Sequence, residues 1–214
     1  MKIAIIGTGR MGKALLKTFY QSYPDSILFS SRSKQKAQEV IQALDLYLEA
    51  ASMEEAMKAD IIIPTLWCED LLPWLAKNKE QLKGKIIIDI TNPFNASFDD
   101  FTTAYDTSSA EEVQKMVPQS TVVGAFKNTY FVVFDQPLLQ GLKSDLYVTS
   151  DHEQALDSVI EALKPLPFRV LNAGSLKNNR TIERMTLLSG ELARKAGNYP
   201  RVSFNLWGLE HEGL

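Results

Sequence analysis

Short apolar runs alternate with amphipathic segments along nearly the whole chain. The first run, Ile3 to Ile6, reads as a buried strand, and the segment after it repeats its apolar residues at helical spacing. Further strands are predicted at 26–30, 61–63, 85–90, 121–125, 146–149 and 168–171. Helices are predicted between them at 34–44, 52–58, 71–81, 109–116 and 153–164. This alternation predicts an α/β fold of Rossmann type, with right-handed crossovers and a doubly wound, mostly parallel sheet.

The C-terminal part of the sequence has a different pattern. A long helix is predicted over 176–196, with an apolar stripe formed by Ile182, Met185, Leu188, Leu192 and Ala196. The tail over 200–214 is rich in large apolar residues, which we expect to pack on the body or on a partner subunit. The sequence thus predicts a small C-terminal helical extension and tail. Two stretches give no clear prediction, a polar loop at 94–108 and the segment 128–142.

A glycine-rich turn follows the first strand and opens the first helix. It is formed by Gly7, Thr8, Gly9, Arg10, Met11 and Gly12. In this strand–turn–helix setting the pattern GxGxxG indicates dinucleotide binding, because a helix N-terminus presents free N–H groups to a pyrophosphate. Gly7 would permit the tight turn, Gly9 the close approach of the pyrophosphate and Gly12 the packing of helix on strand. The alternative is a glycine-rich turn without a ligand.

The segment after the second strand decides between NAD and NADP. An NAD site usually has an acidic residue there to bind the ribose hydroxyls. This chain instead has Ser31, Arg32 and Ser33, with Lys36 one helical turn further on. Hydroxyl and cationic groups suit a 2′-phosphate, and the Arg fork matches phosphate geometry. We therefore predict NADP(H), against the alternative of a polar loop with solvated lysines.

Three later segments, 64–68, 91–94 and 125–129, are predicted to reach the same edge of the sheet, where ligands of such folds lie. The first carries Thr65, Leu66 and Trp67, and the second carries Asn92 and Pro93. We predict that these residues border the cofactor, although Trp67 would fit the core equally well. Taken together, residues 1–174 are expected to form an NADP-binding domain, and residues 175–214 the helix and tail that pack on it.

Composition narrows the classes of function. The net charge of −3 gives no support to nucleic-acid binding, and no apolar run has the roughly 18 residues of a membrane span. One cysteine, Cys68, and two distant histidines offer neither a disulfide nor a metal cluster, so we expect a cytoplasmic protein without a metal site. No general acid or base, and hence no catalytic residue, stands out. This favours hydride transfer to a flavin-like acceptor, for which the protein supplies proximity and orientation.

The chain resembles a known family, the NADP oxidoreductases that depend on the deazaflavin coenzyme F-420, and the related NADPH-binding domain of the STEAP metalloreductases. The resemblance is carried by MKIAIIGTGRMG, the SSRS turn with Lys36, ADIIIPTLW, GKIIIDITNP, VVGAFKNT and NAGSLKNNRTIE. It implies that Thr8, Arg10 and Met11 join the glycines at the pyrophosphate. It also implies that Leu66, Trp67, Asn92 and Pro93 surround the nicotinamide ribose and ring.

Three functions follow as expectations. The first is an NADP(H)-dependent oxidoreductase that transfers a hydride between NADPH and either deazaflavin or an ordinary flavin. The others are an NADP(H)-binding redox sensor without turnover and a relative of the imine or hydroxy-acid reductases. A small-molecule acceptor and a second copy of the chain are the expected partners. The apolar tail and the resemblance both favour a homodimer.

Overall fold

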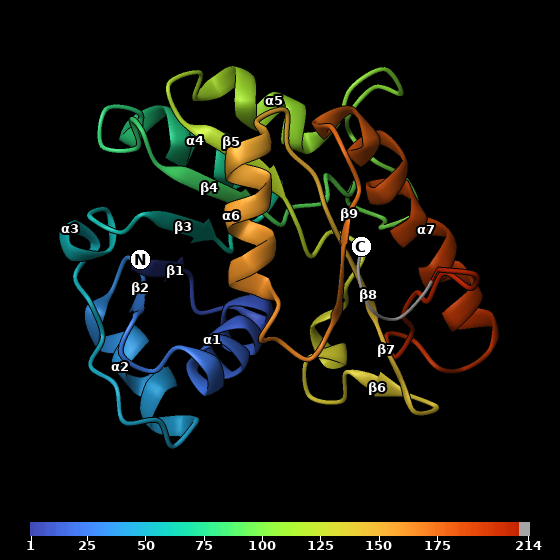
Figure 1. Cartoon of the computed structure of the whole chain (residues 1–214), viewed down its shortest axis with the longest axis horizontal. Coiled ribbons are helices and arrows are strands. Elements are labelled where there is room, and N and C mark those ends of the chain that lie inside the picture. Colours follow the sequence, from blue (N-terminus) through green and yellow to red (C-terminus); the bar gives the residue numbers. More distant parts are fainter. Residues whose placement is uncertain (210–214) are drawn as a thin grey trace.

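A five-stranded, all-parallel sheet forms the centre of the molecule in a computed structural model that describes residues 1–209 (Figure 1). Its strand order is β2-β1-β3-β4-β5. The strands are β1 (Ile3–Ile6), β2 (Ile27–Ser30), β3 (Ile61–Pro64), β4 (Ile86–Asp89) and β5 (Thr121–Gly124). The chain order reverses between β1 and β3, which is the switch point at which such sheets bind ligands. The predicted doubly wound fold is confirmed.

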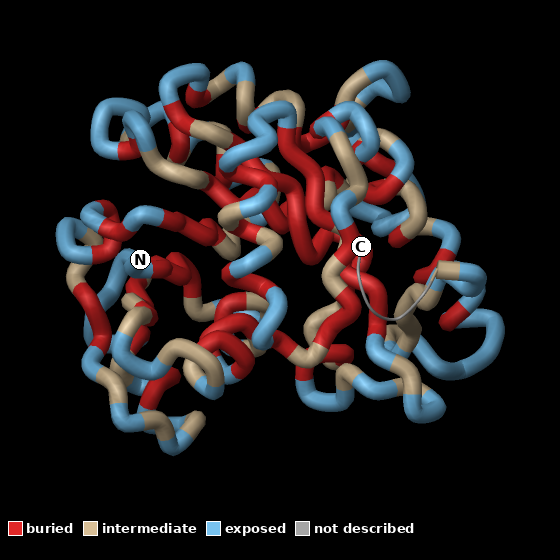
Figure 2. The backbone as a smooth tube through the Cα atoms, in the orientation of Figure 1, coloured by how far each residue is buried: buried red, intermediate tan, exposed pale blue. Residues whose placement is uncertain are grey.

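Helices cover both faces of the sheet and enclose two apolar cores. One core packs side chains of α1 (Arg10–Ser22), α2 (Lys34–Ala43) and α6 (Glu153–Leu163) on the sheet. The other packs those of α3 (Met53–Ala56), α4 (Cys68–Asn78) and α5 (Ser109–Met116). The strands are buried on both sides, which explains their unbroken apolar sequences (Figure 2).

The last two predicted strands form a separate small sheet instead of extending the first. β8 (Asp145–Val148) pairs in parallel with β9 (Arg169–Asn172), and the bridge between Gly124 and Thr149 joins them to the end of β5. The ambiguous segment before them contains a short 3-10 helix, η1 (Phe131–Val133), and a hairpin of β6 (Leu138–Leu139) and β7 (Leu142–Lys143). The chain therefore turns away from the main sheet after β5.

Helix α4 begins earlier than the sequence predicts. It starts at Cys68, with Trp67 as its N-cap, so Pro73 lies inside the helix and not in its first turn. Glu69 and Asp70 in the first turn favour this start, because carboxylates interact well with the positive end of a helix dipole. The earlier start places Trp67 and Cys68 at the same end of the sheet as the glycine turn.

The C-terminal helix buries a different face from the one predicted. A 3-10 turn, η2 (Leu176–Asn178), leads into α7 (Asn179–Lys195), on which Leu188 and Leu192 are 59% and 55% exposed. The buried face carries mostly small or polar side chains. It consists of Asn179, Ile182, Glu183, Thr186, Ser189, Gly190 and Ala193. The predicted apolar stripe is therefore wrong at its centre.

The tail folds back on the small sheet. Arg169 makes two bonds to Asp145, of 2.6 and 2.9 Å, and also donates to the carbonyls of Leu206 and Leu209. Asp145 in turn accepts the backbone N–H of Leu206 at 2.6 Å. This buried ion pair fixes the course of the tail as far as Leu209. Residues 210–214, which complete the predicted tail, lie outside the described part of the chain.

Candidate functional site

The ends of the parallel strands bring the predicted turns to one edge of the sheet. The register pairs Ile6 with both Ser30 and Pro64, and Asp89 with Gly124. The segments that begin at Gly7, Ser31 and Thr65 therefore leave the sheet side by side. Backbone bonds hold them together, from Gly7 N–H to the Ser30 carbonyl at 2.9 Å and from Thr65 N–H to the Ile6 carbonyl at 2.8 Å.

The three glycines of the turn have different surroundings. Gly7 has a φ of +127°, and a Cβ there would lie 2.3 Å from Thr65 Oγ1. A Cβ on Gly12 would lie 2.0 Å from the Gly7 carbonyl oxygen. Gly9 has an ordinary extended backbone, and nothing lies within 4 Å of its would-be Cβ. Packing within the fold thus explains why positions 7 and 12 need glycine. At Gly9 it does not, and the empty space beside this residue and the N-terminus of α1 is called the Gly9 cradle.

The turn after β2 presents exposed cations. The Ser31 hydroxyl donates to the carbonyl of Ser33 at 2.7 Å, and the Ser33 hydroxyl caps α2 by accepting the N–H of Lys36. Within residues 1–209 the side chains of Arg32 and Lys36 have neither an ion pair nor a hydrogen bond. The local structure is therefore fixed by the serines, and the cationic groups are free to bind an anion.

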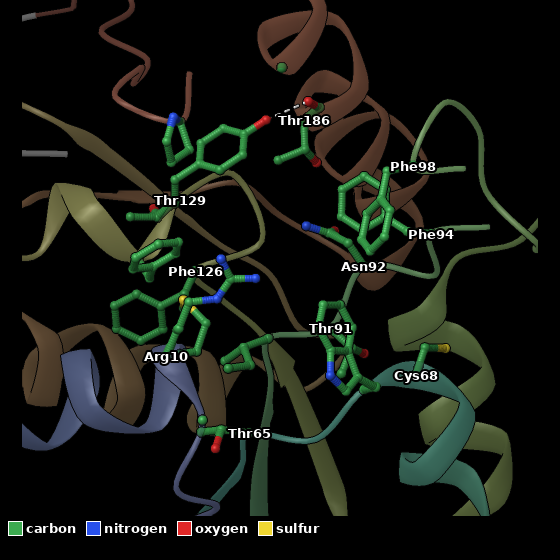
Figure 3. Close-up of a pocket in the computed structure, with 18 of the residues that line it drawn as sticks. Arg10, Thr65, Cys68, Thr91, Asn92, Phe94, Phe98, Phe126, Thr129 and Thr186 are labelled. Atoms are coloured by element: carbon green, nitrogen blue, oxygen red, sulfur yellow. Dashed lines mark hydrogen bonds between the residues drawn. The ribbon is translucent and has the colours of Figure 1, made fainter. Parts of the chain in front are cut away.

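A cavity of about 340 Å³ opens beside the glycine turn (Figure 3). Seven of the predicted residues line it, namely Gly9, Arg10, Met11, Thr65, Leu66, Trp67 and Asn92. Ser31, Arg32, Ser33 and Lys36 do not, and neither do Gly7, Thr8, Gly12 and Pro93. The cavity and the cationic turn thus lie at separate places along the same edge of the sheet. A single ligand would have to be extended to reach both.

Aromatic rings form much of the cavity wall. Phe94 and Phe98 lie 5.5 Å apart between ring centroids, Trp67 lies 6.0 Å from Phe98, and the Arg10 guanidinium lies 4.7 Å from the centre of the Phe131 ring. The predicted edge segment 91–94 includes Phe94, whereas no role is predicted for Phe98 in the polar loop or for Phe131 in the ambiguous segment. The three phenylalanines at 94, 98 and 101 could have indicated this wall from sequence. Three aromatic rings in an otherwise polar loop are expected to pack together on an apolar surface.

The last of the predicted edge segments, 125–129, supplies Thr129 to the cavity wall, whereas no role is predicted for Tyr130 or for the wall that α7 provides. Thr129 and Tyr130 follow β5, and Thr186 and Gly190 belong to α7. The Tyr130 hydroxyl donates to the Thr186 carbonyl at 2.8 Å, and a Cβ on Gly190 would lie 2.8 Å from that hydroxyl. Gly190 therefore makes room for Tyr130, which closes this side of the cavity.

A buried lysine lies directly behind the cavity. The Lys127 ammonium group contacts Asp89 at 2.7 Å, Glu183 at 2.8 Å and the Thr91 carbonyl at 2.6 Å, and all three charged side chains are at most 1% exposed. Glu183 also accepts the N–H of Ser109, at the start of α5. We name Asp89, Lys127 and Glu183 the lysine cluster. It connects the ends of β4 and β5 to α5 and α7.

The pKa values follow from this arrangement. Burial alone would lower the pKa of Lys127, but the two carboxylates raise it above its ordinary value. Burial raises the pKa of Glu183, against the opposing effect of Lys127. Burial also raises the pKa of the Cys68 thiol in the cavity wall, and the charge of Asp89 adds to the effect. Cys68 is therefore a neutral thiol at pH 7 and no nucleophile.

In residues 1–209, no helix is long and apolar enough to cross a membrane, and no group of three or more potential metal ligands gathers. The cavity wall itself contains no histidine, aspartate, glutamate or lysine from this part of the chain. The polar groups that these described residues bring to the wall are hydroxyls, an amide, a thiol and two guanidinium groups, and the rest of the wall is aromatic or aliphatic.

Comparison with known proteins agrees with this geometry. Residues 2–93 match the family model described as NADP oxidoreductase, coenzyme F-420-dependent. An F-420-dependent NADP reductase of Methanocaldococcus jannaschii is 31% identical over 88% of this chain and 90% of its own length. A metalloreductase of Rattus norvegicus, STEAP3, is 25% identical, with 87% of this chain aligned to 36% of the relative.

Solved structures support the fold over a larger span. A putative F-420-dependent NADP reductase from Arthrobacter sp. FB24 superposes with a TM-score of 0.79 at 20% identity, over 92% of this chain and 95% of its own. Together with the relative from M. jannaschii, these matches show that the chain belongs to the family of F-420-dependent NADP reductases and is an NADP-dependent oxidoreductase.

Proposed function

We propose that this protein transfers a hydride between NADPH and a flavin-like acceptor, either deazaflavin coenzyme F-420 or an ordinary flavin. The observation that carries the proposal is the aromatic cavity of about 340 Å³ at the N-terminus of α1, to whose wall residues 1–209 contribute no acid–base pair. A flat ring system fits such walls, and hydride transfer between two rings requires mainly that they be held face to face.

The residues of the sheet edge would hold the cofactor in two parts. Gly9, Arg10 and Met11 would receive the pyrophosphate at the free N–H groups of α1, where the helix dipole is positive. Arg32 and Lys36, assisted by Ser31, would bind the 2′-phosphate. The open cradle at Gly9 and the lack of partners for the two cations within residues 1–209 fit these roles. Bound NADPH supplies the hydride.

The aromatic wall would hold the acceptor. Phe94, Phe98 and Trp67 are neighbours in the wall, and Tyr130 and Phe131 line the same cavity. Leu66 and Asn92 line the same cavity. The wall would exclude water from the reacting carbons, and the protein's contribution to the rate would be orientation.

Stopped-flow mixing of NADPH-loaded protein with F-420, FMN or FAD tests the proposal. We expect the NADPH absorbance to decrease faster than in a control without protein. If NADPH binds but no flavin accelerates its oxidation, the protein acts as a redox sensor and the proposal is wrong. Turnover with cyclic imines or hydroxy acids, and with no flavin, would instead favour the reductases of those substrates.

Replacing Arg32 with Glu is expected to reverse the preference for NADPH over NADH. Hydrogen bonds to charged groups contribute about 1.5–3 kcal/mol each, and exposure to water and salt reduces this. We expect the wild type to prefer NADPH by about 2–3 kcal/mol, or roughly 30- to 150-fold. The variant repels the phosphate and offers a carboxylate to the ribose of NADH. The measurement is the ratio of the two dissociation constants.

Lys177→Glu is the matched control for this prediction, because it makes the same change of charge on an exposed side chain of η2. It should leave the ratio unchanged. If the wild type binds both cofactors within about threefold of each other, or if Arg32→Glu behaves like the control, the phosphate site is assigned wrongly.

A homodimer is expected from the apolar side chains that α7 and the tail leave in contact with water. Leu188 and Leu192 of α7 are exposed, and in the tail Leu206 is 52% and Trp207 is 76% exposed. Exposed apolar side chains that gather into one surface patch often mark a protein–protein interface. Light scattering should give twice the mass of one chain, and Leu192→Glu should shift it towards the monomer. Leu138→Glu, at a leucine of β6 that is 53% exposed, should not.

A further inference from the structure

Two buried polar atoms at the cavity have no partner among residues 1–209. They are the hydroxyl oxygen of Thr129 and the amide oxygen of Asn92. Both residues line the cavity, and Thr129 is only 6% exposed. Buried polar atoms without a hydrogen bond are rare in folded proteins, because burial costs them their contact with water. Each such atom therefore calls for an explanation.

The orientation of Asn92 is fixed by its neighbour. Its amide nitrogen donates to the Lys127 carbonyl at 2.7 Å. A carbonyl oxygen can only accept, so the nitrogen has to face it, and the amide oxygen is the atom that remains unpaired. Asn92 therefore presents an acceptor at the cavity wall.

Thr129 comes from the neighbouring loop. A turn closed by the bond from its N–H to the Phe126 carbonyl, at 3.1 Å, holds it between two aromatic residues of the wall. Because β4 and β5 are adjacent, the loops that carry Asn92 and Thr129 leave the same edge of the sheet, and Figure 3 shows both side chains at one cavity. The Thr129 hydroxyl can donate to a carbonyl, whereas the amide oxygen of Asn92 can only accept, for example from an N–H.

We propose that Thr129 is a further positioning residue, whose hydroxyl, together with the Asn92 amide oxygen, binds a ligand edge that has an N–H group beside a carbonyl. This inference rests on the proposed function. Such an edge occurs on the carboxamide of nicotinamide and on the pyrimidine ring of a flavin. Either ring would be fixed in its own plane by these bonds, while the aromatic wall fixes its faces.

Thr129→Val and Thr129→Ser test the proposal. Valine keeps the shape but not the hydroxyl, and serine keeps the hydroxyl. We expect Thr129→Val to weaken binding about tenfold, which corresponds to about 1.4 kcal/mol, and Thr129→Ser to restore most of it. The dissociation constant of NADPH tests whether Thr129 binds the nicotinamide ring, which we call the nicotinamide arm of the test. The KM for FMN or F-420 tests whether it binds the flavin ring, which we call the acceptor arm. Whichever quantity changes identifies the ring that Thr129 binds.

Melting of the ligand-free protein separates positioning from a structural role. Removing a buried hydroxyl that has no partner should leave the melting temperature of Thr129→Val unchanged or higher. The matched control is Thr149→Val, at a buried threonine whose hydroxyl accepts from Asn179 at 2.6 Å. That variant should melt at a lower temperature, because it removes one of the two acceptors of the Asn179 amide nitrogen and leaves only the Leu176 carbonyl.

The inference is overturned if Thr129→Val matches the wild type in both arms, or if serine fails to restore what valine loses. Its failure can be told from that of the proposed function. A wild type that reduces no flavin refutes the function, whereas a change in NADPH binding on Thr129→Val would still support the nicotinamide arm.

Discussion

Gly9→Val should abolish NADPH binding in a protein that remains folded. The backbone at Gly9 has φ −72° and ψ −174°, which valine adopts readily, and its side chain would enter empty space. That space is where a pyrophosphate would approach the N–H groups of α1. Losing two bonds to a charged group would cost about 3–6 kcal/mol, so we expect affinity to decrease at least 100-fold. Fluorescence titration with NADPH measures the loss, and circular dichroism checks the fold.

The neighbouring glycines provide the contrast. Gly7→Ala and Gly12→Ala should reduce stability itself, because their methyl groups would lie 2.3 Å from the Thr65 side chain and 2.0 Å from a backbone carbonyl. Valine at position 9 should cost about 1 kcal/mol or less, as a poorer N-cap than glycine. If Gly9→Val binds NADPH normally while folded, the cradle does not hold the pyrophosphate.

Lys127→Met should destabilise the protein by about 3–5 kcal/mol. The variant leaves Asp89 and Glu183 buried and without their shared cation, and breaking a buried ion pair on one side has an effect of this size. Domains are stable by only about 5–15 kcal/mol, so the loss is a large fraction of the total. Urea unfolding followed by tryptophan fluorescence gives the change in the free energy of unfolding.

Lys58→Met serves as the control. Lys58 pairs with Glu54 at 2.9 Å, but both side chains are largely exposed. Such pairs contribute about 1 kcal/mol at most, so this variant should remain close to the wild type. Adding Glu183→Gln to Lys127→Met should recover part of the stability, because it removes one of the two unpaired charges. Equal losses for Lys58→Met and Lys127→Met would contradict the assigned role of the cluster.

The sheet could be predicted from sequence because its signals are local. Each strand is a short apolar run next to a turn, and Ile61 to Ile63 and Ile86 to Ile88 need no partner to be recognised. The glycine turn is local in the same way, since its meaning depends only on the strand before it and the helix after it. The NADP-binding residues proposed there stay predictions until binding is measured.

The cavity wall could not be predicted because it depends on contacts between distant residues. The apolar count along α7 selected Leu188 and Leu192, yet the helix buries Glu183 and Gly190. Glu183 lies on that face because it pairs with Lys127. Gly190 lies there because a larger side chain would collide with Tyr130. Neither partner can be identified from the helix alone. A single lysine in VVGAFKNT, directly after a buried strand, was the one local sign that a buried carboxylate had to exist elsewhere.

The lysine cluster also has a consequence for biosynthesis. A ribosome delivers Asp89 and Lys127 before Glu183, and at about 5–20 residues per second the delay after Lys127 is several seconds. Until Glu183 is synthesised, the Lys127 ammonium group can have only one of its two carboxylate partners, and the Ser109 N–H at the start of α5 has no Glu183 acceptor. The cavity wall also includes Thr186, Gly190 and Pro200, so the cavity can be complete only after α7 and the first residues of the tail have been translated.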